Sequence, residues 1–330
     1  MKKFAATSIT LLMLIATSTS AFGWGDKGHK TVGQVAQLRL AGTHALTKIN
    51  EILLPGETLA SIATWADKVK NEKSFKPTAT SPDPDTQDFF SKMANQHNRK
   101  WHFVDLPLHC TGYNDIACKS FTSSSDIVHM INLSITKLRG GNVPQLTRRN
   151  ALRLLVHLVG DLHQPLHVGV GFINVDDENN KILIEREATL ILQNDFPSDI
   201  GANKLLITGA DSDNLHSFWD TDLVETASNN QSILQFATTL NNEIPAGTAW
   251  DAQGNLTTWA AQWAGDTLRA SNVHAYDSSV EIKKVVIIDD EPKYQTKLGN
   301  NYKSQNTPVV KEQLEKGGYR LAKLLQAIFP

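Results

Sequence analysis

Residues 148–167, which read RRNALRLLVHLVGDLHQPLH, decide how this chain folds. Apolar residues recur in this stretch at steps of three and four, which predicts a helix over 148–162. On that helix His157 and Asp161 lie one turn apart and share a face, whereas Pro165 ends the helix and frees His167 to point elsewhere. Imidazole and carboxylate groups are metal ligands, so this single segment can serve two separate metal sites.

The same helical periodicity dominates the rest of the chain, and strand-like alternation is rare. Further helices are expected over 31–40, 125–138, 231–241, 257–270 and 309–328. The best strand candidates are 181–192 and 204–207, which could pair as a hairpin, and 280–288. Loops rich in Pro, Gly and Asp are expected over 76–88 and 140–144. With no long linker or internal repeat, residues 24–330 are predicted to form one all-α domain with at most a small β-hairpin.

Residues 1–23 have the features of a signal peptide. Lys2 and Lys3 precede an apolar run that is too short to span a bilayer, and Ala21 and Gly23 occupy the two positions that a signal peptidase reads. Cleavage is therefore expected before Trp24, giving a secreted or periplasmic chain without a membrane anchor; a retained anchor is the weaker alternative. Loss of the two lysines takes the formal net charge from −2 to −4, so any affinity for phosphate must be local.

The only two cysteines, Cys110 and Cys118, are close in sequence. In a chain bound for an oxidising compartment, they are expected to form a disulfide that closes a short loop. Two free thiols are the less favoured alternative. A zinc site built on these two residues alone is disfavoured because structural zinc sites draw on four Cys or His ligands.

A second His/Asp pair at helical spacing, His216 and Asp220, follows Asp211 and Asp213, which are candidate helix caps. Three shorter elements each place a potential ligand beside a tryptophan: Trp24-Gly-Asp-Lys-Gly-His29, Trp65-Ala-Asp67 and Trp101-His102-Phe103-Val104-Asp105. Taken singly, each has a structural explanation, because a lone histidine is usually a packed core group and a His/Asp pair is often a simple helical contact. Taken together, five histidines and three aspartates fit ligation of zinc outside the cytoplasm.

The ordered set of these elements resembles the zinc-dependent single-strand-specific nucleases, the S-one/P-one family, over nearly the whole chain. The resemblance implies a mainly helical phospholipase C/nuclease-type fold around a cleft with three zinc ions. It assigns the first zinc to Asp67, His102, His157 and Asp161, the second to Asp161, His29 and the amino nitrogen and carbonyl oxygen of Trp24, and the third to His167, His216 and Asp220. His163 lies among these residues but is not assigned as a ligand.

The activity implied by this resemblance is hydrolysis of single-stranded DNA and RNA to products with 5′ phosphates, together with 3′-nucleotidase activity. A paired metal site can supply a hydroxide near neutral pH, and a third cation can stabilise the leaving 3′ oxygen. By resemblance Asp67 orients the attacking water, and Lys70 lies near the phosphate, where fungal relatives carry Arg. Lys keeps the charge but lacks the bidentate geometry of Arg, so this chain departs from its fungal relatives at the phosphate contact.

Phe103 and Asp105 match the family positions where an aromatic ring stacks on a base and a carboxylate accepts hydrogen bonds from it. Stacking suits unpaired bases, although the apolar neighbours of Phe103 also allow a core position. Asn203 belongs to Asp199-Ile-Gly-Ala-Asn203, the counterpart of a Gly-Gly-Asn element that comes earlier in family members. The segment 171–197 before it is therefore an insertion, which either flanks the cleft or decorates the surface.

Two other functions remain open at this point. A zinc phospholipase C would share the fold and the metal chemistry but cleave lipid phosphodiesters; the base-contacting pair Phe103 and Asp105 favours a nuclease instead. A non-catalytic zinc protein would have saturated sites with no position for water. We expect nucleic acids and 3′-nucleotides as substrates, no stable protein partner and a monomer.

Overall fold

The computed structural model describes residues 24–70, 83–93, 98–176, 181–208 and 210–330. Its centre is helix α7 (Arg148–Leu162), in which every residue from Asn150 to Leu162 is buried. The Thr147 side chain caps this helix by accepting the Asn150 N–H, and the helix ends at Leu162, before Pro165, as the sequence predicts. A helix buried on all sides is expected to carry the core and whatever site the core encloses.

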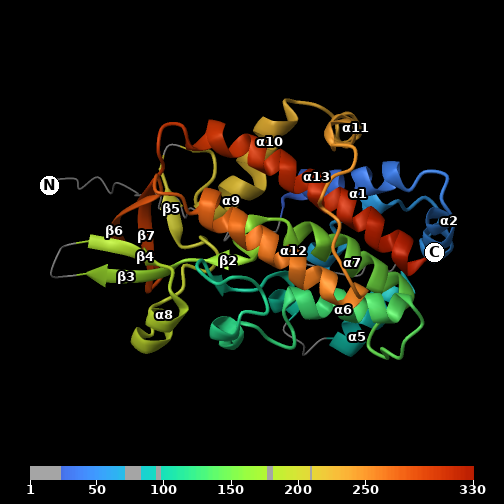
Figure 1. Ribbon diagram of the computed structural model, residues 1–330, viewed down its shortest axis with the longest axis horizontal. Helices are drawn as coiled ribbons and strands as arrows, with labels where there is room; N and C mark the ends of the chain where they lie inside the picture. Colours follow the sequence, from blue (N-terminus) through green and yellow to red (C-terminus); the bar gives the residue numbers. More distant parts are fainter. Residues whose placement is uncertain (1–23, 71–82, 94–97, 177–180, 209) are drawn as a thin grey trace, which may run out of the picture.

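Long helices surround α7 (Figure 1). Helix α6 (Ile127–Leu138) packs along it, and α1 (Asp26–Arg39), α12 (Leu256–Ala270) and α13 (Tyr302–Ile328) cover its other sides. The remaining helices are α2 (His44–Ile52), α3 (Leu59–Ile62), α4 (Trp65–Val69), α5 (Pro84–Met93), α8 (Ala188–Asn194), α9 (Leu215–Ser217), α10 (Leu223–Ser228) and α11 (Ile233–Glu243), with short 3-10 or π segments η1 (Asn98–His102), η2 (Ile116–Phe121), η3 (Pro165–His167), η4 (Phe218–Asp222) and η5 (Ser271–Ala275). The prediction of a mainly helical fold is confirmed.

The structure has three small sheets in its described part. Strand β1 (Leu106–Pro107) pairs in parallel with β2 (Gly169–Val170), and β3 (Phe172–Asp176) pairs in antiparallel fashion with β4 (Lys181–Glu185). In the third sheet, β7 (Glu291–Lys297) lies between β5 (Leu205–Ile207) and β6 (Glu281–Ile288). Strands β3 to β7 lie at one end of the molecule, on the left in Figure 1, and β2 lies nearer its middle. The β1–β2 pair joins the segment after His102 to the segment after His167, so it brings two stretches with ligand-type side chains together.

Several sequence-based expectations about local structure are wrong. The stretch 181–192 is a strand only as far as Glu185 and continues as α8, and its partner is β3 rather than 204–207. Helix α5 begins at Pro84, inside the loop expected over 76–88, of which 76–82 lies outside the described residues. Helix α13 begins at Tyr302 and runs through Pro308 instead of starting after it. Helix α9 is capped by Asn214, which accepts the Ser217 N–H, and not by Asp211 or Asp213.

The insertion 171–197 consists of β3, β4 and α8 in its described part. Its Phe172 ring meets the Phe121 ring of η2 edge to face, with 5.6 Å between the centroids. Arg186, between β4 and α8, donates hydrogen bonds to the carbonyl oxygens of Tyr276 and Asn272. The insertion is therefore bonded to the body of the protein by its own backbone and side chains.

Candidate metal centre

Helix α7 presents two ligand-type side chains on one face, as the spacing predicts. His157 Nδ1 lies 2.7 Å from the Ala63 carbonyl oxygen, which orients the ring and directs Nε2 to the opposite side. That Nε2 lies 2.9 Å from Asp161 Oδ2. Both side chains are fully buried.

A first group of possible ligands consists of Asp67, His102 and His157, whose ligand atoms all lie within 4.8 Å of one another. Asp67 comes from α4 and His102 from the end of η1. His102 Nδ1 is 2.9 Å from Asp161 Oδ2, so this aspartate adjoins the group as well. Lys70 Nζ lies 2.5 Å from Asp67 Oδ1 and places a positive charge beside it.

A second group, His29, His157 and Asp161, lies directly next to the first. His29 Nε2 is 3.2 Å from Asp161 Oδ1, and its ring stacks on the His157 ring with centroids 4.0 Å apart. Gly160 makes room for this ring, because a Cβ at that position would lie 2.8 Å from His29 Nδ1. Asp161 thus turns one oxygen to each group.

Trp24 lies two residues before the start of α1, the helix that carries His29 of the second group. It is fully buried, and a Cβ on Gly28 would lie only 2.7 Å from the Trp24 Cβ. The next residue, Gly25, donates its N–H to the Asp220 carbonyl oxygen over 3.0 Å. The first residue of the expected mature chain is therefore packed between the His29 helix and the segment that carries Asp220.

The third group is His167, His216 and Asp220. The π segment η4 carries Asp220, and η3 carries His167, which Pro165 has turned away from the axis of α7. His216 Nε2 lies 3.3 Å from Asp220 Oδ2, while Gln164 Nε2 donates to Asp220 Oδ1 over 2.7 Å. The structure therefore brings together all eight His and Asp residues that the sequence singles out as ligands.

Backbone carbonyl groups orient the imidazoles in a common way. His157 Nδ1 faces the Ala63 oxygen, His167 Nδ1 faces the His102 oxygen at 2.7 Å, and His216 Nδ1 faces the Gly201 oxygen at 2.6 Å. When Nδ1 donates its proton to a carbonyl, Nε2 keeps a lone pair for a cation. His163 differs, because its Nδ1 faces the Val159 oxygen and its Nε2 faces Arg320 at 3.2 Å, so it joins none of the three groups.

Buried polar atoms without a hydrogen-bond partner converge on these groups. Among the described residues they include His29 Nε2, Asp67 Oδ1, Asp161 Oδ1, His167 Nε2 and His216 Nε2. Each such atom costs roughly 1–3 kcal/mol when it is left unsatisfied. Metal ions would satisfy them, and a set of imidazole nitrogens and carboxylate oxygens is the donor set that zinc accepts.

Burial favours the metal-binding, neutral state of His102 and His216, whereas for His157 the charges of Asp161 and Asp67 outweigh burial and raise the pKa. Burial lowers the pKa of His102 to about 4 and that of His216 to about 3, since an imidazolium loses its hydration there. Burial opposes ionisation of Asp67, but the charges of His157 and Lys70 outweigh it and lower the pKa of that carboxyl to about 2. His102 and His216 are therefore neutral, and Asp67 ionised, near neutral pH.

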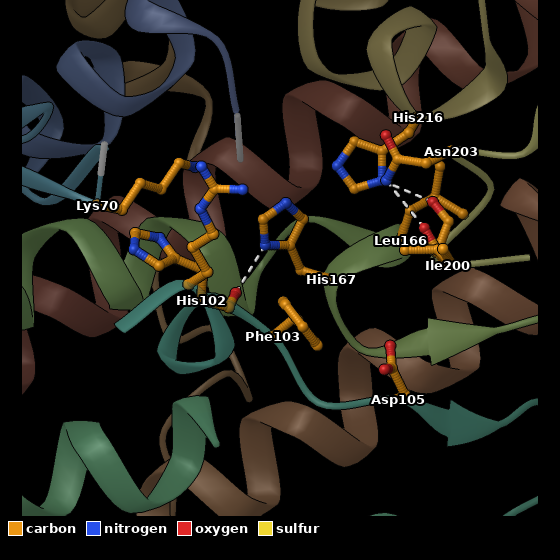
Figure 2. Close-up of a pocket in the computed structure, with 11 residues that line it drawn as sticks. Lys70, His102, Phe103, Asp105, Leu166, His167, Ile200, Asn203 and His216 are labelled. Carbon is orange, nitrogen blue, oxygen red and sulfur yellow. Dashed lines mark hydrogen bonds between the residues drawn. The ribbon is translucent and has the colours of Figure 1, made fainter. Parts of the chain in front are cut away.

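A cavity of about 260 Å³ opens onto the first and third groups (Figure 2). All four residues predicted to contact substrate line it: Lys70, Phe103, Asp105 and Asn203. In Figure 2 Phe103 lies between the His102 side and the Asn203 side of the cavity. Burial raises the pKa of Asp105 to about 6, so this carboxyl changes charge in the mildly acidic range.

Arg99 and Leu166, which sequence reasoning did not single out, also line the cavity, as do Ile200 and Gly201 of the predicted element 199–203. Arg99 is exposed and comes three residues before His102. That spacing is a usable signal, because a basic residue near a ligand motif is a candidate phosphate contact. Ile200 and Gly201 reach the cavity because their backbone is left-handed, a conformation that the residue pattern does not predict.

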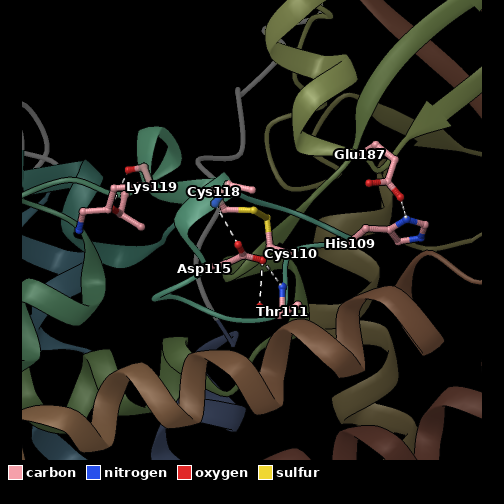
Figure 3. The surroundings of a disulfide bond; sticks show 9 residues. His109, Cys110, Thr111, Asp115, Cys118, Lys119 and Glu187 are labelled. Carbon is pink, nitrogen blue, oxygen red and sulfur yellow. Dashed lines mark hydrogen bonds and ion pairs between the residues drawn. A yellow bond between two sulfur atoms is a disulfide. The ribbon is translucent and has the colours of Figure 1, made fainter.

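The predicted disulfide between Cys110 and Cys118 is confirmed, with its two Cα atoms 6.1 Å apart (Figure 3). The disulfide closes a loop that contains Asp115. The Asp115 carboxylate stabilises this loop, because it accepts hydrogen bonds from Thr111 and from the Ala117 N–H. His109, just before the loop, pairs with Glu187 of the insertion at 2.6 Å. The segment at the disulfide therefore contacts the insertion, and no residue of the loop belongs to the three ligand groups.

Comparison with known proteins gives consistent matches along the chain. The family model described as S1/P1 Nuclease matches residues 24–330. The chain is 28% identical to Nuclease S1 of Aspergillus oryzae over 95% of this chain and 94% of that protein. It is 25% identical to Endonuclease 3 of Arabidopsis thaliana, over 97% of this chain and 94% of that protein, and 26% identical to Nuclease P1 of Penicillium citrinum, over 92% and 97%.

Proposed function

This chain belongs to the S1/P1 nuclease family, and we propose that it is a zinc-dependent endonuclease acting on single-stranded nucleic acid outside the cytoplasm. Family membership makes it a hydrolase of phosphodiester bonds. We further propose cleavage of both DNA and RNA to products with 5′ phosphates, together with 3′-nucleotidase activity. The observation that supports this most directly is the convergence of three ligand groups on a cavity that also contains Phe103 and Asp105.

Three zinc ions would be held by the three groups. Asp161 would bridge the first two ions, and the amino nitrogen and carbonyl oxygen of Trp24 would complete the second site. Bound there, zinc would lower the pKa of a water molecule and stabilise negative charge on the leaving 3′ oxygen. The protein itself supplies Asp67, one oxygen of which lies beside Lys70, to orient the attacking water, while Lys70 attracts the phosphate.

The cavity offers a physical basis for preferring unpaired bases. The Phe103 ring is partly exposed to the cavity, where a base can stack on it, and Asp105 and Asn203 can hydrogen-bond to the edge of that base. A base inside a duplex reaches such a ring only after unstacking, which costs a few kcal/mol. Single strands therefore bind without this free-energy cost of unstacking.

The proposed ligand role of Trp24 leads to a proposal about how the chain is processed. We propose that residues 24–330 form one nuclease domain and that residues 1–23, which lie outside the described residues, are removed before the protein is active. The disulfide is consistent with a secreted or periplasmic location. No helix within the described ranges is long and apolar enough to cross a membrane.

Product release from a panel of substrates tests the proposal. The panel contains single-stranded DNA, single-stranded RNA, duplex DNA, 3′-nucleotides and phosphatidylcholine, each with and without a chelator. We expect chelator-sensitive release of 5′-nucleotides from both single strands, phosphate from 3′-nucleotides, and much slower attack on the duplex. Hydrolysis of phosphatidylcholine alone would show a phospholipase C instead, and no hydrolysis in a zinc-loaded protein would show a binding protein.

Arg99 provides a prediction about the phosphate contact, because it lines the cavity together with Lys70. Hydrogen bonds to a charged group contribute about 1.5–3 kcal/mol, so Arg99→Ala is expected to raise KM for single-stranded DNA about 10-fold or more with little change in kcat. Steady-state kinetics would measure this. The exposed neighbour Lys100, which does not line the cavity, serves as the control in Lys100→Ala. Equal KM values for the two variants would contradict a role for Arg99.

Asp105 provides a prediction about pH. Since its pKa is raised to about 6, the carboxylate form that accepts hydrogen bonds from a base is gained as pH rises through 6. Adenosine, which has no phosphate, is expected to bind about 10-fold more tightly at pH 7 than at pH 5, as calorimetry can measure. Asp105→Asn should flatten this dependence. A pH profile that is the same in both proteins would exclude Asp105 as the titrating group.

A further inference from the structure

The loop from Asp199 to Asn203 forms one wall of the cavity and has an unusual backbone. Three consecutive residues are left-handed, with φ of 59° at Ile200, 54° at Gly201 and 64° at Ala202. This conformation is unfavourable for residues other than glycine, and especially for a β-branched residue such as Ile200. Such a run persists only where neighbouring groups hold it in place.

The Asp199 carboxylate is the group that holds this loop. It is fully buried, and its Oδ1 accepts the Ala202 N–H over 2.9 Å, which closes the loop on itself. The buried Tyr276 hydroxyl donates to the same carboxylate, at 2.9 Å from Oδ2 and 3.1 Å from Oδ1. The backbone of Asp199 is also bonded on both sides, to the Gly171 oxygen and the Lys204 N–H. Asp199 thus links the loop to the side chain of Tyr276, the residue that directly follows η5.

The loop in turn delivers groups to the third ligand group and to the cavity. Its Gly201 carbonyl oxygen lies 2.6 Å from His216 Nδ1 and so determines which ring nitrogen of His216 faces Asp220. A side chain at Gly201 is excluded, because a Cβ would lie 2.4 Å from the Leu166 oxygen. Ile200, from the same turn, stands in the cavity wall beside Asn203 (Figure 2).

The insertion contacts both Asp199 and Tyr276. Arg186 donates to the Tyr276 carbonyl oxygen, and a Cβ on Gly171 would lie 2.6 Å from Asp199 Oδ2 and 3.0 Å from the Tyr276 ring. Ile184 of β4 touches the same point, at 2.9 Å from that Cβ position. The insertion therefore packs directly against Asp199 and Tyr276.

We propose that Asp199, held by Tyr276, is a positioning residue for the third metal ion: it fixes the left-handed loop whose Gly201 carbonyl orients His216. This inference rests on the proposed function in that it takes His167, His216 and Asp220 to bind zinc. It gives the insertion a role as a support of the metal site.

Zinc binding to the whole mature protein tests the inference without a nuclease assay. Zinc is titrated against a competing chelator, and native mass spectrometry counts the ions per chain. Groups that orient a metal ligand typically contribute 10- to 100-fold to affinity, so Asp199→Ala should weaken the third zinc by about that factor and leave the other two unchanged. Tyr276→Phe keeps the ring and should give a smaller loss, about 3- to 10-fold, at the same site.

Asp199→Asn is the rescue variant. Burial raises the pKa of Asp199 to about 7, against the opposing effect of its hydrogen bonds, so a neutral group is already well tolerated there. The amide keeps an oxygen for the Ala202 N–H, and we expect the third zinc to bind within about threefold of the parent. Tyr113→Phe is the matched control, because Tyr113 donates to the buried Asp126 over 2.9 Å in the same kind of pair.

The outcomes separate the possible explanations. Selective loss of the third zinc in Asp199→Ala and Tyr276→Phe, with rescue by Asn and no loss in Tyr113→Phe, supports the inference. Unchanged zinc affinity in Tyr276→Phe and Asp199→Ala, or equal weakening of all three ions, overturns it. If Asp199→Ala does not fold, Tyr276→Phe decides alone. Three zinc ions without nuclease activity in the parent would refute the proposed function and leave this test valid.

Discussion

Replacing Asp161 with Asn is expected to empty two metal sites at once and to lower nuclease activity by at least about 10³-fold. The geometry explains why one side chain has this effect. Oδ1 of Asp161 lies 3.2 Å from His29 Nε2, whereas Oδ2 lies 2.9 Å from both His102 Nδ1 and His157 Nε2. An amide has one weak acceptor oxygen and a nitrogen that cannot bind a cation, so it cannot bridge two zinc ions.

Elemental analysis of the purified Asp161→Asn protein should find one zinc ion per chain, bound at the third group. Asp220→Asn is the matched control, because Asp220 belongs to the third group alone. That variant should lose one ion and keep two. If Asp161→Asn retains two ions, Asp161 is a ligand of a single site and the bridging assignment is wrong.

One extra residue before Trp24 is expected to weaken the second zinc site and to reduce activity by about 10²-fold or more. The change turns a basic amine into a peptide nitrogen, which has no lone pair for a cation. Trp24 has no freedom to move away, because it is fully buried against Gly28 and the following Gly25 N–H is bonded to Asp220. Processing and catalysis would then be linked, since the precursor carries such a peptide nitrogen.

Two proteins that differ only in an alanine before Trp24 allow the measurement. Zinc content and cleavage of single-stranded DNA are compared, and an aminopeptidase then removes the alanine. Recovery of the second zinc and of activity after trimming would identify the free amine as the missing ligand. Equal activity of the two proteins before trimming would exclude the Trp24 amine from the site.

The main helices could be predicted because burial of one face leaves a repeat of three and four residues in the sequence. Helices α6, α7 and α12 begin and end within about two residues of their expected limits. Their ends are also local, as the Thr147 cap and the Pro165 stop of α7 show. Helix α13 is the exception, since it tolerates Pro308 near its start, where the pattern predicted a boundary.

The strands could not be predicted as well, because a short strand depends on its partner. Residues 181–192 alternate enough to predict a strand, but only the first five pair with another strand, and Ala188–Asn194 forms a helix instead. The pairing of β5 with β7 joins residues nearly 90 positions apart in the sequence. No local pattern contains that contact.

The ligand types and their pairing on α7 were determined by the sequence alone, because one helical turn places His157 and Asp161 on one face in any fold. Only the tertiary structure decided which other residues meet them: Asp67 and His29 come from separate helices, and the cavity also takes Arg99 and Ile200. The left-handed loop at Asp199 is the clearest case. Its conformation is unfavourable by itself and exists because distant groups, Tyr276 and the insertion, hold it.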